Sequence, residues 1–362
     1  MTTEDPTPGA TVGPAPDSVL PEPAAASGVG SLPGTTPRDA ANLVFSETDL
    51  PYVPELPNRG PGAEIIGRTM ALLSQVDPAF SVTTTTSGWR ITDRPGRDVR
   101  RALSWWGEDL DAVEEFASGY VGPVKLQLAG PLTLAANVEL VSGEKVLRDA
   151  GARRDIASAL EVAAVGVVAD LRRRVPNAHV VVQFDEPSLP AVLAGVVKSA
   201  SGLTTLSAVE PQEIELLLEG LVAALHGNNA AAAVHSCAPR PPLDLWRTCG
   251  FDLVSFDATL LGESDYDHLG AAIDAGQRLL LGAVRADGSA TADSAIELIT
   301  HLQRQLSFDD ATWLPSIGVS PTCGLASLKP DQARGAIAVT RAVARSLRGN
   351  SDSDQRDISG PR

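Results

Sequence analysis

The sequence is poor in cysteine, in aromatic residues and in basic charge. Only 3 of its 362 residues are Cys and 4% are aromatic, and 29 Lys and Arg stand against 45 Asp and Glu, which gives a net charge of −16. Three Cys make no disulfide framework, so their expected uses are packing, metal binding or catalysis. An acidic chain without a basic stripe is a poor partner for nucleic acid or an anionic membrane.

Long apolar runs are also missing. No stretch approaches the length that spans a bilayer, and the N-terminus has neither the basic start nor the apolar segment of a signal peptide. We therefore expect no membrane partner and a cytoplasmic location. Residues 1–26 and 348–362 lack hydrophobic periodicity, so we predict two disordered tails around a single domain at residues 27–347.

The folded part alternates buried strands with helices. Eight segments have the apolar or β-branched composition of strands, and apolar residues recur at helical spacing between them. The predicted strands are residues 27–33, 80–87, 123–129, 178–184, the apolar start of 230–240, 253–256, 278–284 and 312–319. This pattern predicts an α/β fold, a (β/α)8 TIM barrel. The rival is a doubly wound open sheet, but the GxGxxG turn of its dinucleotide-binding form is missing.

The most informative segment is AAAAVHSCAPR, residues 230–240. Side chains two apart on a strand point to the same face, so His235 and Cys237 project together from the end of this strand. Imidazole beside thiolate indicates Zn²⁺. For this pair alone, a hydrogen-bonded core His and a buried Cys are an equally good interpretation.

Polar residues also follow other predicted strands, at the end where barrel enzymes carry their active sites. They are Ser31, Asp185, Glu186, Asp257 and Cys323. With Asp257 and Cys323, the His–Cys pair supplies one nitrogen, two sulfurs and one oxygen, which is a tetrahedral zinc set.

Each of these residues also has a structural alternative. Asp257 could cap a helix, as Asp often does where a strand leads into a helix. Cys323 could be packed before its Gly neighbour, and Asp185 could be held by the turn at Pro187. Cys249, before a helix-ending Gly, is interpreted as buried and structural. The collection of the selected groups at one end of the barrel favours a site, because independent packing residues would scatter.

Five motifs, in this order, resemble a known family. VGSLPGT, QFDEPSL, VHSC, VSFDA and SPTCGL are similar to the C-terminal catalytic domain of cobalamin-independent methionine synthase. This domain belongs to the barrel superfamily that also holds uroporphyrinogen decarboxylase. The likeness covers most of residues 27–347, and the chain is similar to short, single-barrel members of the family.

The resemblance implies a zinc-dependent methyltransferase that methylates the thiol of homocysteine to give methionine. His235, Cys237 and Cys323 match zinc ligands, and Asp257 stands where the family has a Glu ligand. Zinc lowers the thiol pKa, so that a thiolate nucleophile exists at neutral pH. Two cysteinates and one carboxylate leave this site with a net negative charge, which keeps the substrate sulfur electron-rich.

The resemblance also implies a substrate site. Ser31 and Asp185 match residues that hold and orient the amino-acid end of homocysteine, and Glu108 in WWGED matches a further substrate-binding Glu. These residues would orient the thiol for attack on the methyl group.

The loop after the seventh predicted strand departs from the family. The full-length enzymes carry a proton-shuttling His there, whereas this chain has GAVRADG, with Arg285 and Asp287 near that place. Methyl transfer from methyltetrahydrofolate must protonate the departing nitrogen, and an ordinary Asp287 is ionised at neutral pH. A methylcorrinoid requires no such acid. We therefore expect methylcobalamin, free or on a corrinoid protein, to be the better donor.

Two other functions stay open. A non-catalytic zinc-binding or thiol-binding barrel would bind homocysteine without turning over any methyl donor. A uroporphyrinogen decarboxylase-like enzyme would need no metal and would leave the His/Cys/Cys set unexplained.

Overall fold

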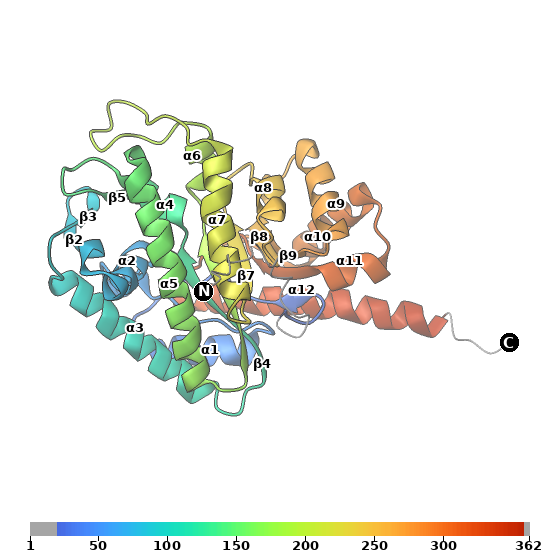
Figure 1. Ribbon diagram of the computed structural model, residues 1–362. Helices are drawn as coiled ribbons and strands as arrows, with labels where there is room; N and C mark the ends of the chain where they lie inside the picture. Colours follow the sequence, from blue (N-terminus) through green and yellow to red (C-terminus); the bar gives the residue numbers. More distant parts are fainter. Residues whose placement is uncertain (1–19, 358–362) are drawn as a thin grey trace, which may run out of the picture.

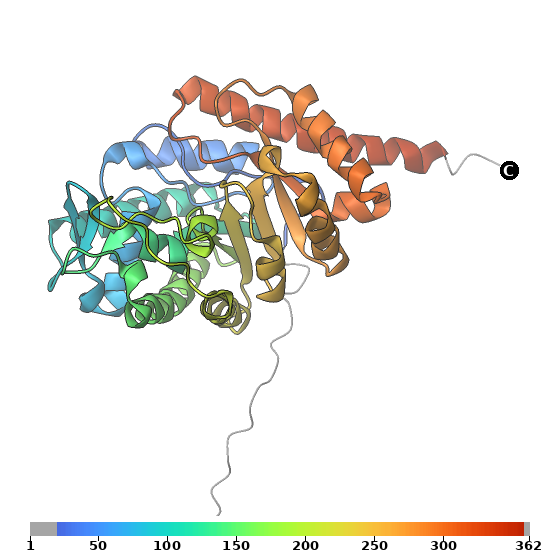
Figure 2. The ribbon, with the colours of Figure 1, turned by 90° about the horizontal axis from the view of Figure 1, so that it is seen from above.

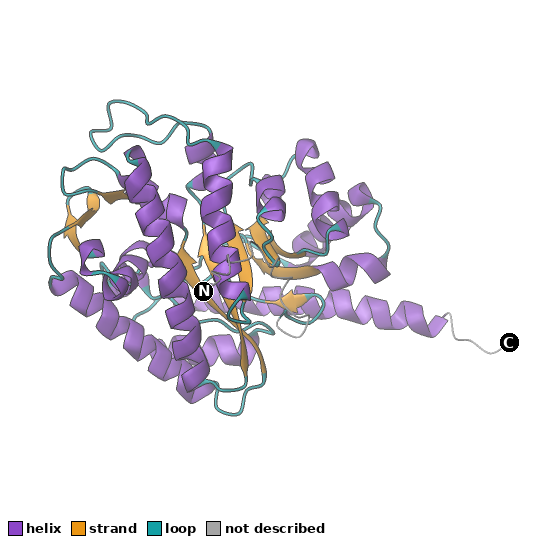
Figure 3. Ribbon diagram, in the orientation of Figure 1, coloured by secondary structure: helices purple, strands orange, loops and turns teal. Residues whose placement is uncertain are grey.

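The computed structural model describes residues 20–357 and shows parallel strands surrounded by helices (Figures 1 and 3). The predicted tails at 1–26 and 348–362 lie partly outside the described residues and stay predictions. Within the described part, β1 already begins at Ala25, and the last helix continues to Asp357.

The strands are β1 (Ala25–Ala26), β2 (Val82–Thr85), β3 (Gly88–Ile91), β4 (Gly122–Ala129), β5 (Val138–Glu139), β6 (Ala178–Asp185), β7 (Ala231–Ser236), β8 (Leu253–Asp257), β9 (Arg278–Val284) and β10 (Ile317–Pro321). The α-helices are α1 (Pro37–Glu47), α2 (Ile65–Val76), α3 (Arg97–Phe116), α4 (Pro131–Asn137), α5 (Ala150–Arg174), α6 (Leu189–Leu193), α7 (Pro211–His226), α8 (Leu243–Thr248), α9 (Tyr266–Asp274), α10 (Ala292–Leu306), α11 (Asp310–Ser316) and α12 (Pro330–Asp357). Short 3₁₀ turns are η2 (Pro57–Arg59), η3 (Pro78–Phe80), η4 (Val146–Arg148), η5 (Ala258–Leu260) and η6 (Glu263–Asp265).

Seven strands form one curled parallel sheet in the order β1-β10-β9-β8-β7-β6-β4. The strands from β6 to β10 pair with their neighbours in chain order, as helical crossovers require. Their carboxyl ends therefore all lie at the same edge of the sheet. Figure 2 shows the helices around the sheet, with α1 (blue) beside α12 (red).

Residues 50–55 fill the gap between the two edge strands, β1 and β4. Isolated parallel bridges join Ser27 to Leu50, Ser31 to Glu55 and Tyr52 to Lys125. Pro51 and Pro54 have no backbone N–H to donate, so this segment cannot build a continuous ladder. The α/β prediction is confirmed, but a barrel of eight regular strands is not. The segment, expected to be part of a loop, occupies the place of the second strand.

The predicted second strand, residues 80–87, is wrong as a strand of the main sheet. β2 pairs antiparallel with β3, and both belong to a small separate sheet with β5. Only Val82 of β2 is buried, because a run of Thr is too polar for a strand that is covered on both faces. Gly88, with a φ of 130°, follows the turn of this hairpin.

Two other predicted strands are displaced. The predicted strand at 312–319 begins too early, because α11 continues to Ser316 before β10 begins. The predicted strand at 27–33 is wrong, because β1 ends at Ala26 and residues 27–33 are irregular chain with isolated bridges. The five predictions in the middle match β4, β6, β7, β8 and β9 to within two residues at each end.

Strand residues alternate between the helix-covered outer face of the sheet and its inner face. A small apolar cluster, separate from the main core, collects inner-face residues: Leu50, Val181, Ala231, Ala233, Leu253 and Leu280. Two residues further along each strand the inner face becomes polar, with Gln183 on β6, His235 on β7 and Ser255 on β8. The inner face of the sheet is therefore apolar in its middle and polar at the carboxyl ends of the strands.

Candidate functional site

His235 lies at the end of β7 with only 3% of its surface exposed. Its Nδ1 is 2.9 Å from Oγ of Ser255 on the next strand. Its Nε2 is buried and has no hydrogen-bond partner within residues 20–357. An imidazole held through one nitrogen, with the other left free, is the usual arrangement of a metal-binding His.

Cys237 and Cys323 lie against each other, with their sulfurs 3.2 Å apart and no disulfide between them. β8 and β9 separate their strands in the sheet, so the curl of the sheet is what brings the two thiols together. Contact with Cys237, and then with the His235 imidazole, lowers the pKa of the Cys323 thiol to about 4. The contact with Cys323, together with burial, raises the pKa of Cys237.

Asp257 shows the structural role that the sequence left open as its alternative. Its Oδ1 accepts hydrogen bonds from the backbone N–H of Thr259 at 2.9 Å and from the Thr259 hydroxyl at 2.6 Å, and so caps η5. Among the residues that the structure describes, no group of three or more His, Cys, Asp or Glu is arranged to hold a metal ion. The four-ligand zinc set therefore stays a prediction.

Asp185 and Ser31 both lie beside the thiol pair. Asp185 is in register with His235 on the neighbouring strand, and burial raises the pKa of its carboxyl to about 7, against the opposing effect of that His. Ser31 lies against the residue after Cys323, because a Cβ added to Gly324 would be 2.1 Å from the Ser31 hydroxyl. The structure thus brings both predicted substrate-binding residues to one place.

Glu108 lies elsewhere, on α3. Its side chain is 53% exposed, and its carboxylate is 3.8 Å from Nη1 of Arg59. The acidic residue paired with Ser31, by a backbone bridge, is Glu55, which is 3% exposed and whose carboxylate lies 3.1 Å from Arg68. Sequence reasoning missed Glu55 because its Pro-rich segment looks like a loop. The available signal was an acidic residue within the otherwise apolar run LPYVPEL.

Arg285 and Asp287 follow β9 on the surface. Two nitrogens of Arg285 contact Oδ2 of Asp287 at 2.8 and 3.0 Å, while Ser289 donates to Oδ1. The bonds from Ser289, and then from Arg285, hold the pKa of Asp287 well below its usual range. Arg285 and Asp287 line an open cavity of about 330 Å³, together with Asp257 and Thr322. Asp287 is therefore ionised at neutral pH and unsuited to donate a proton.

Glu186 and Cys249 serve the fold. The Glu186 carboxylate accepts hydrogen bonds from the backbone N–H groups of Leu132 and Thr133 and from the Thr133 hydroxyl, and so caps α4. Burial raises the pKa of Glu186 to about 7. Cys249 is buried, 3.9 Å from the carbonyl of Glu215. Its packing agrees with the structural interpretation drawn from the sequence.

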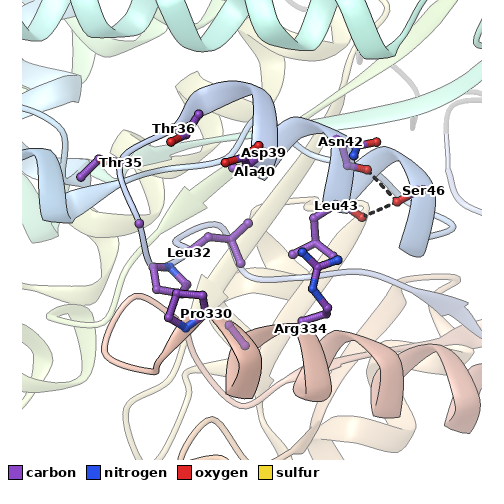
Figure 4. Close-up of a pocket in the computed structure, with 13 residues that line it drawn as sticks. Leu32, Thr35, Thr36, Asp39, Ala40, Asn42, Leu43, Ser46, Pro330 and Arg334 are labelled. Carbon is purple, nitrogen blue, oxygen red and sulfur yellow. Dashed lines mark hydrogen bonds between the residues drawn. The ribbon is translucent and has the colours of Figure 1, made fainter.

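Another cavity, of about 250 Å³, lies between α1 and the start of α12 (Figure 4). Arg334 extends from α12 toward Leu43 of α1, and Asp39 lies nearer the start of α1 (Figure 4). None of the residues predicted from the sequence to form the site lines this cavity.

The comparisons with known proteins assign the chain to a family. Residues 120–346 match the family model described as the catalytic domain of the cobalamin-independent synthase. The chain belongs to this family. The resemblance noted in the sequence is thereby confirmed over these residues, which include the His-x-Cys and Cys-Gly motifs. The expected corrinoid donor is not supported, because this family is the cobalamin-independent one.

Two solved structures resemble the chain at low identity. A B12-independent methionine synthase from Shewanella sp. W3-18-1, in complex with selenomethionine, is 15% identical over 67% of each chain, with a TM-score of 0.49. A glycoside hydrolase family 20 β-N-acetylglucosaminidase is 9% identical over 65% of this chain and 54% of its own, with a TM-score of 0.39. These likenesses are too low to bear on function. No curated protein sequence matches the chain significantly.

The described residues contain no helix that is both long and apolar enough to cross a membrane.

Proposed function

We propose that this member of the cobalamin-independent synthase family is a zinc-dependent methyltransferase. It transfers a methyl group from methyltetrahydrofolate to the thiol of homocysteine and gives methionine. One observation carries the proposal: two thiols and an imidazole with a free nitrogen meet beside Asp185, inside the region that matches the family model.

The residues present suit zinc. Imidazole nitrogen and cysteine sulfur are its preferred protein ligands, and Nε2 of His235 is a buried nitrogen without a hydrogen-bond partner within residues 20–357. His235, Cys237 and Cys323 would hold the ion, and Asp257 is the proposed fourth ligand if it leaves Thr259. When bound, the ion would keep the substrate thiol deprotonated at neutral pH.

The amino-acid end of homocysteine would lie against Ser31, Glu55 and Asp185. The two carboxylates would bind the substrate ammonium group, and Ser31 would donate a hydrogen bond to its carboxylate. Because Ser31 contacts Gly324, the residue after Cys323, the amino-acid end of the substrate would lie close to a proposed zinc ligand. Binding at both places would fix the orientation of the substrate sulfur, which removes part of the entropic barrier to reaction.

Methyl transfer would then be a displacement at carbon. The thiolate sulfur forms a bond to the methyl carbon, the carbon–nitrogen bond of the donor breaks, and the nitrogen takes up a proton. Ionised Asp287 cannot supply this proton. The donor would enter through the open cavity beside Asp257 and Thr322, where water can supply it.

Zinc analysis and a methionine assay test the proposal. We expect one zinc per chain and methionine formation from homocysteine and methyltetrahydrofolate, faster than with methylcobalamin. Asp185→Asn should weaken homocysteine binding by about 1.5–3 kcal/mol, the scale of a hydrogen bond to a charged group, and should keep the zinc. Asp309→Asn, at an exposed helix cap, is the control and should change neither. Homocysteine binding without turnover of either donor would contradict a catalytic role.

A further inference from the structure

The backbone carbonyl of Val29 receives two buried side-chain donors. Nζ of Lys125 donates to it at 2.8 Å, and Nε2 of Gln183 donates at 3.1 Å. Both donors come from the inner face of the sheet and are fully buried. Val29 lies in the irregular chain after β1, two residues before Ser31. These two bonds therefore support the backbone that presents Ser31.

Gln183 makes a second hydrogen bond toward the site. The same Nε2 donates to Oδ1 of Asp185 at 2.6 Å. A side-chain amide carries two hydrogens on its nitrogen, so one Gln can make both bonds at once. Its Oε1 has no hydrogen-bond partner within residues 20–357. Through these two hydrogen bonds, Gln183 connects the Val29 backbone, which lies two residues before Ser31, to the carboxylate of Asp185.

A neighbouring Gln supports the other irregular segment in a similar way. Nε2 of Gln127 donates to the carbonyl of Val53 at 2.7 Å, in the segment that presents Glu55. Gly30 lies against this amide, because an added Cβ would be 2.8 Å from its nitrogen. Buried polar side chains therefore supplement the isolated backbone bridges on this side of the sheet.

We propose that Gln183 is a positioning residue that sets the separation between Ser31 and Asp185, and thereby selects thiols with an α-amino-acid end. The inference rests on the proposed function, in which Ser31 and Asp185 hold the two charged groups of homocysteine. A neutral amide suits the place, because it donates to the Asp185 carboxylate without competing with the substrate as a charged group. An apolar side chain of equal length would make no hydrogen bond to the Val29 carbonyl or to the Asp185 carboxylate.

Calorimetric binding to the zinc-loaded protein tests this role. Gln183→Met keeps the length of the side chain and removes the donor. We expect the Kd for homocysteine to rise about tenfold or more, as for the loss of one buried hydrogen bond to a charged group, with the zinc content unchanged. The Kd for butanethiol, which has no amino-acid end, should stay the same. Gln183→Asn is a second variant, to be used if Gln183→Met does not fold. It retains the amide but is too short to reach both acceptors, so it should show the same loss of homocysteine affinity.

Gln277→Met is the matched control. Gln277 is also a buried Gln whose Nε2 donates to two carbonyls, those of Trp246 and Phe251, but it precedes β9, at the opposite end of the sheet from the site. Its replacement should lower the unfolding midpoint and leave the Kd for homocysteine unchanged.

Three outcomes would count against the inference. An unchanged Kd for homocysteine in both Gln183 variants overturns it and leaves the proposed function intact. Equal weakening of homocysteine and butanethiol means a general structural role and also overturns it. A wild-type protein that binds no homocysteine overturns the proposed function, and the inference with it.

Discussion

The two sides of the sheet hold their functional residues in different ways. On the regular side, from β6 to β10, neighbouring strands form ladders of several residue pairs, and the four predicted zinc ligands lie at or just after their ends. On the irregular side, residues 27–32 and 50–55 between β1 and β4 have only isolated bridges. Buried side chains from β4 and β6 give their carbonyls additional support.

This difference predicts which replacements alter function and which alter stability. A strand ladder is built from backbone groups, so a side chain at its end can be exchanged without loss of the support beneath it. Support by a buried side chain is lost with that side chain, and the group it served stays buried without a partner. We therefore expect replacements at the ends of the regular side to alter chemistry alone, and replacements of the supporting side chains to alter stability as well.

The largest effect is expected from Cys323→Ser, on the regular side. Loss of a ligand should lower zinc affinity by more than the roughly 10–100-fold that follows loss of a hydrogen-bond partner around a metal, and should abolish methionine formation. The unfolding midpoint of the metal-free protein should stay near that of the metal-free wild type. Metal analysis and thermal unfolding measure the two. Cys249→Ser is the control and should keep its zinc, and a zinc-replete Cys323→Ser protein would show that the ligand set is different.

A smaller effect, now on stability, is expected from Lys125→Met on the irregular side. Lys125 donates to the Val29 carbonyl and lies near the buried Glu55 and Asp185. Its removal takes one of two donors from the buried Val29 carbonyl, and should lower the free energy of unfolding by about 1–3 kcal/mol in urea titrations near pH 10, where little of the cost of burying the Lys125 charge remains. Lys145→Met, which removes a partly exposed donor to the Ala136 carbonyl, should cost less than about 1 kcal/mol. Equal losses in the two variants would contradict the comparison.

The same Lys gives the irregular side a pH dependence. Burial lowers the pKa of Lys125 from 10.5 to about 8 in the folded protein. Between these two values the unfolded chain binds more protons at this group than the folded one, so its contribution makes the free energy of unfolding rise as the pH rises from 8 to 10.5. Lys125→Met should remove this part of the slope. Parallel slopes for variant and wild type would mean that Lys125 does not titrate in this window.

The smallest effect is expected from Asp287→Asn, at an exposed end of the regular side. The pKa of Asp287 lies well below its usual range, so the residue is ionised throughout the neutral range and gives up no proton. We expect the rate of methionine formation to change by less than about twofold. A true general acid typically contributes about 10²–10⁴-fold. A loss of that size, with an altered pH profile, would identify Asp287 as the proton donor after all.

The sequence by itself determined the regular side. Five predicted strands match β4 and β6 to β9, because strands covered on both faces are continuous apolar runs that can be recognised locally. His235 and Cys237 share a face because strand residues two apart always do. The family resemblance rests on such short motifs, and the match to residues 120–346 lies mostly within this part of the chain.

Only the tertiary structure decided the irregular side. Residues 50–55 have the prolines of a loop, and their place in the gap depends on bonds from Arg68, Gln127 and Lys125, which come from other parts of the chain. For the same reason Glu55, rather than Glu108, lies beside Ser31. The approach of Cys237 to Cys323 likewise depends on the curl of the whole sheet. A local pattern records how a segment can satisfy its own backbone, whereas these contacts exist only when distant segments supply the missing partners.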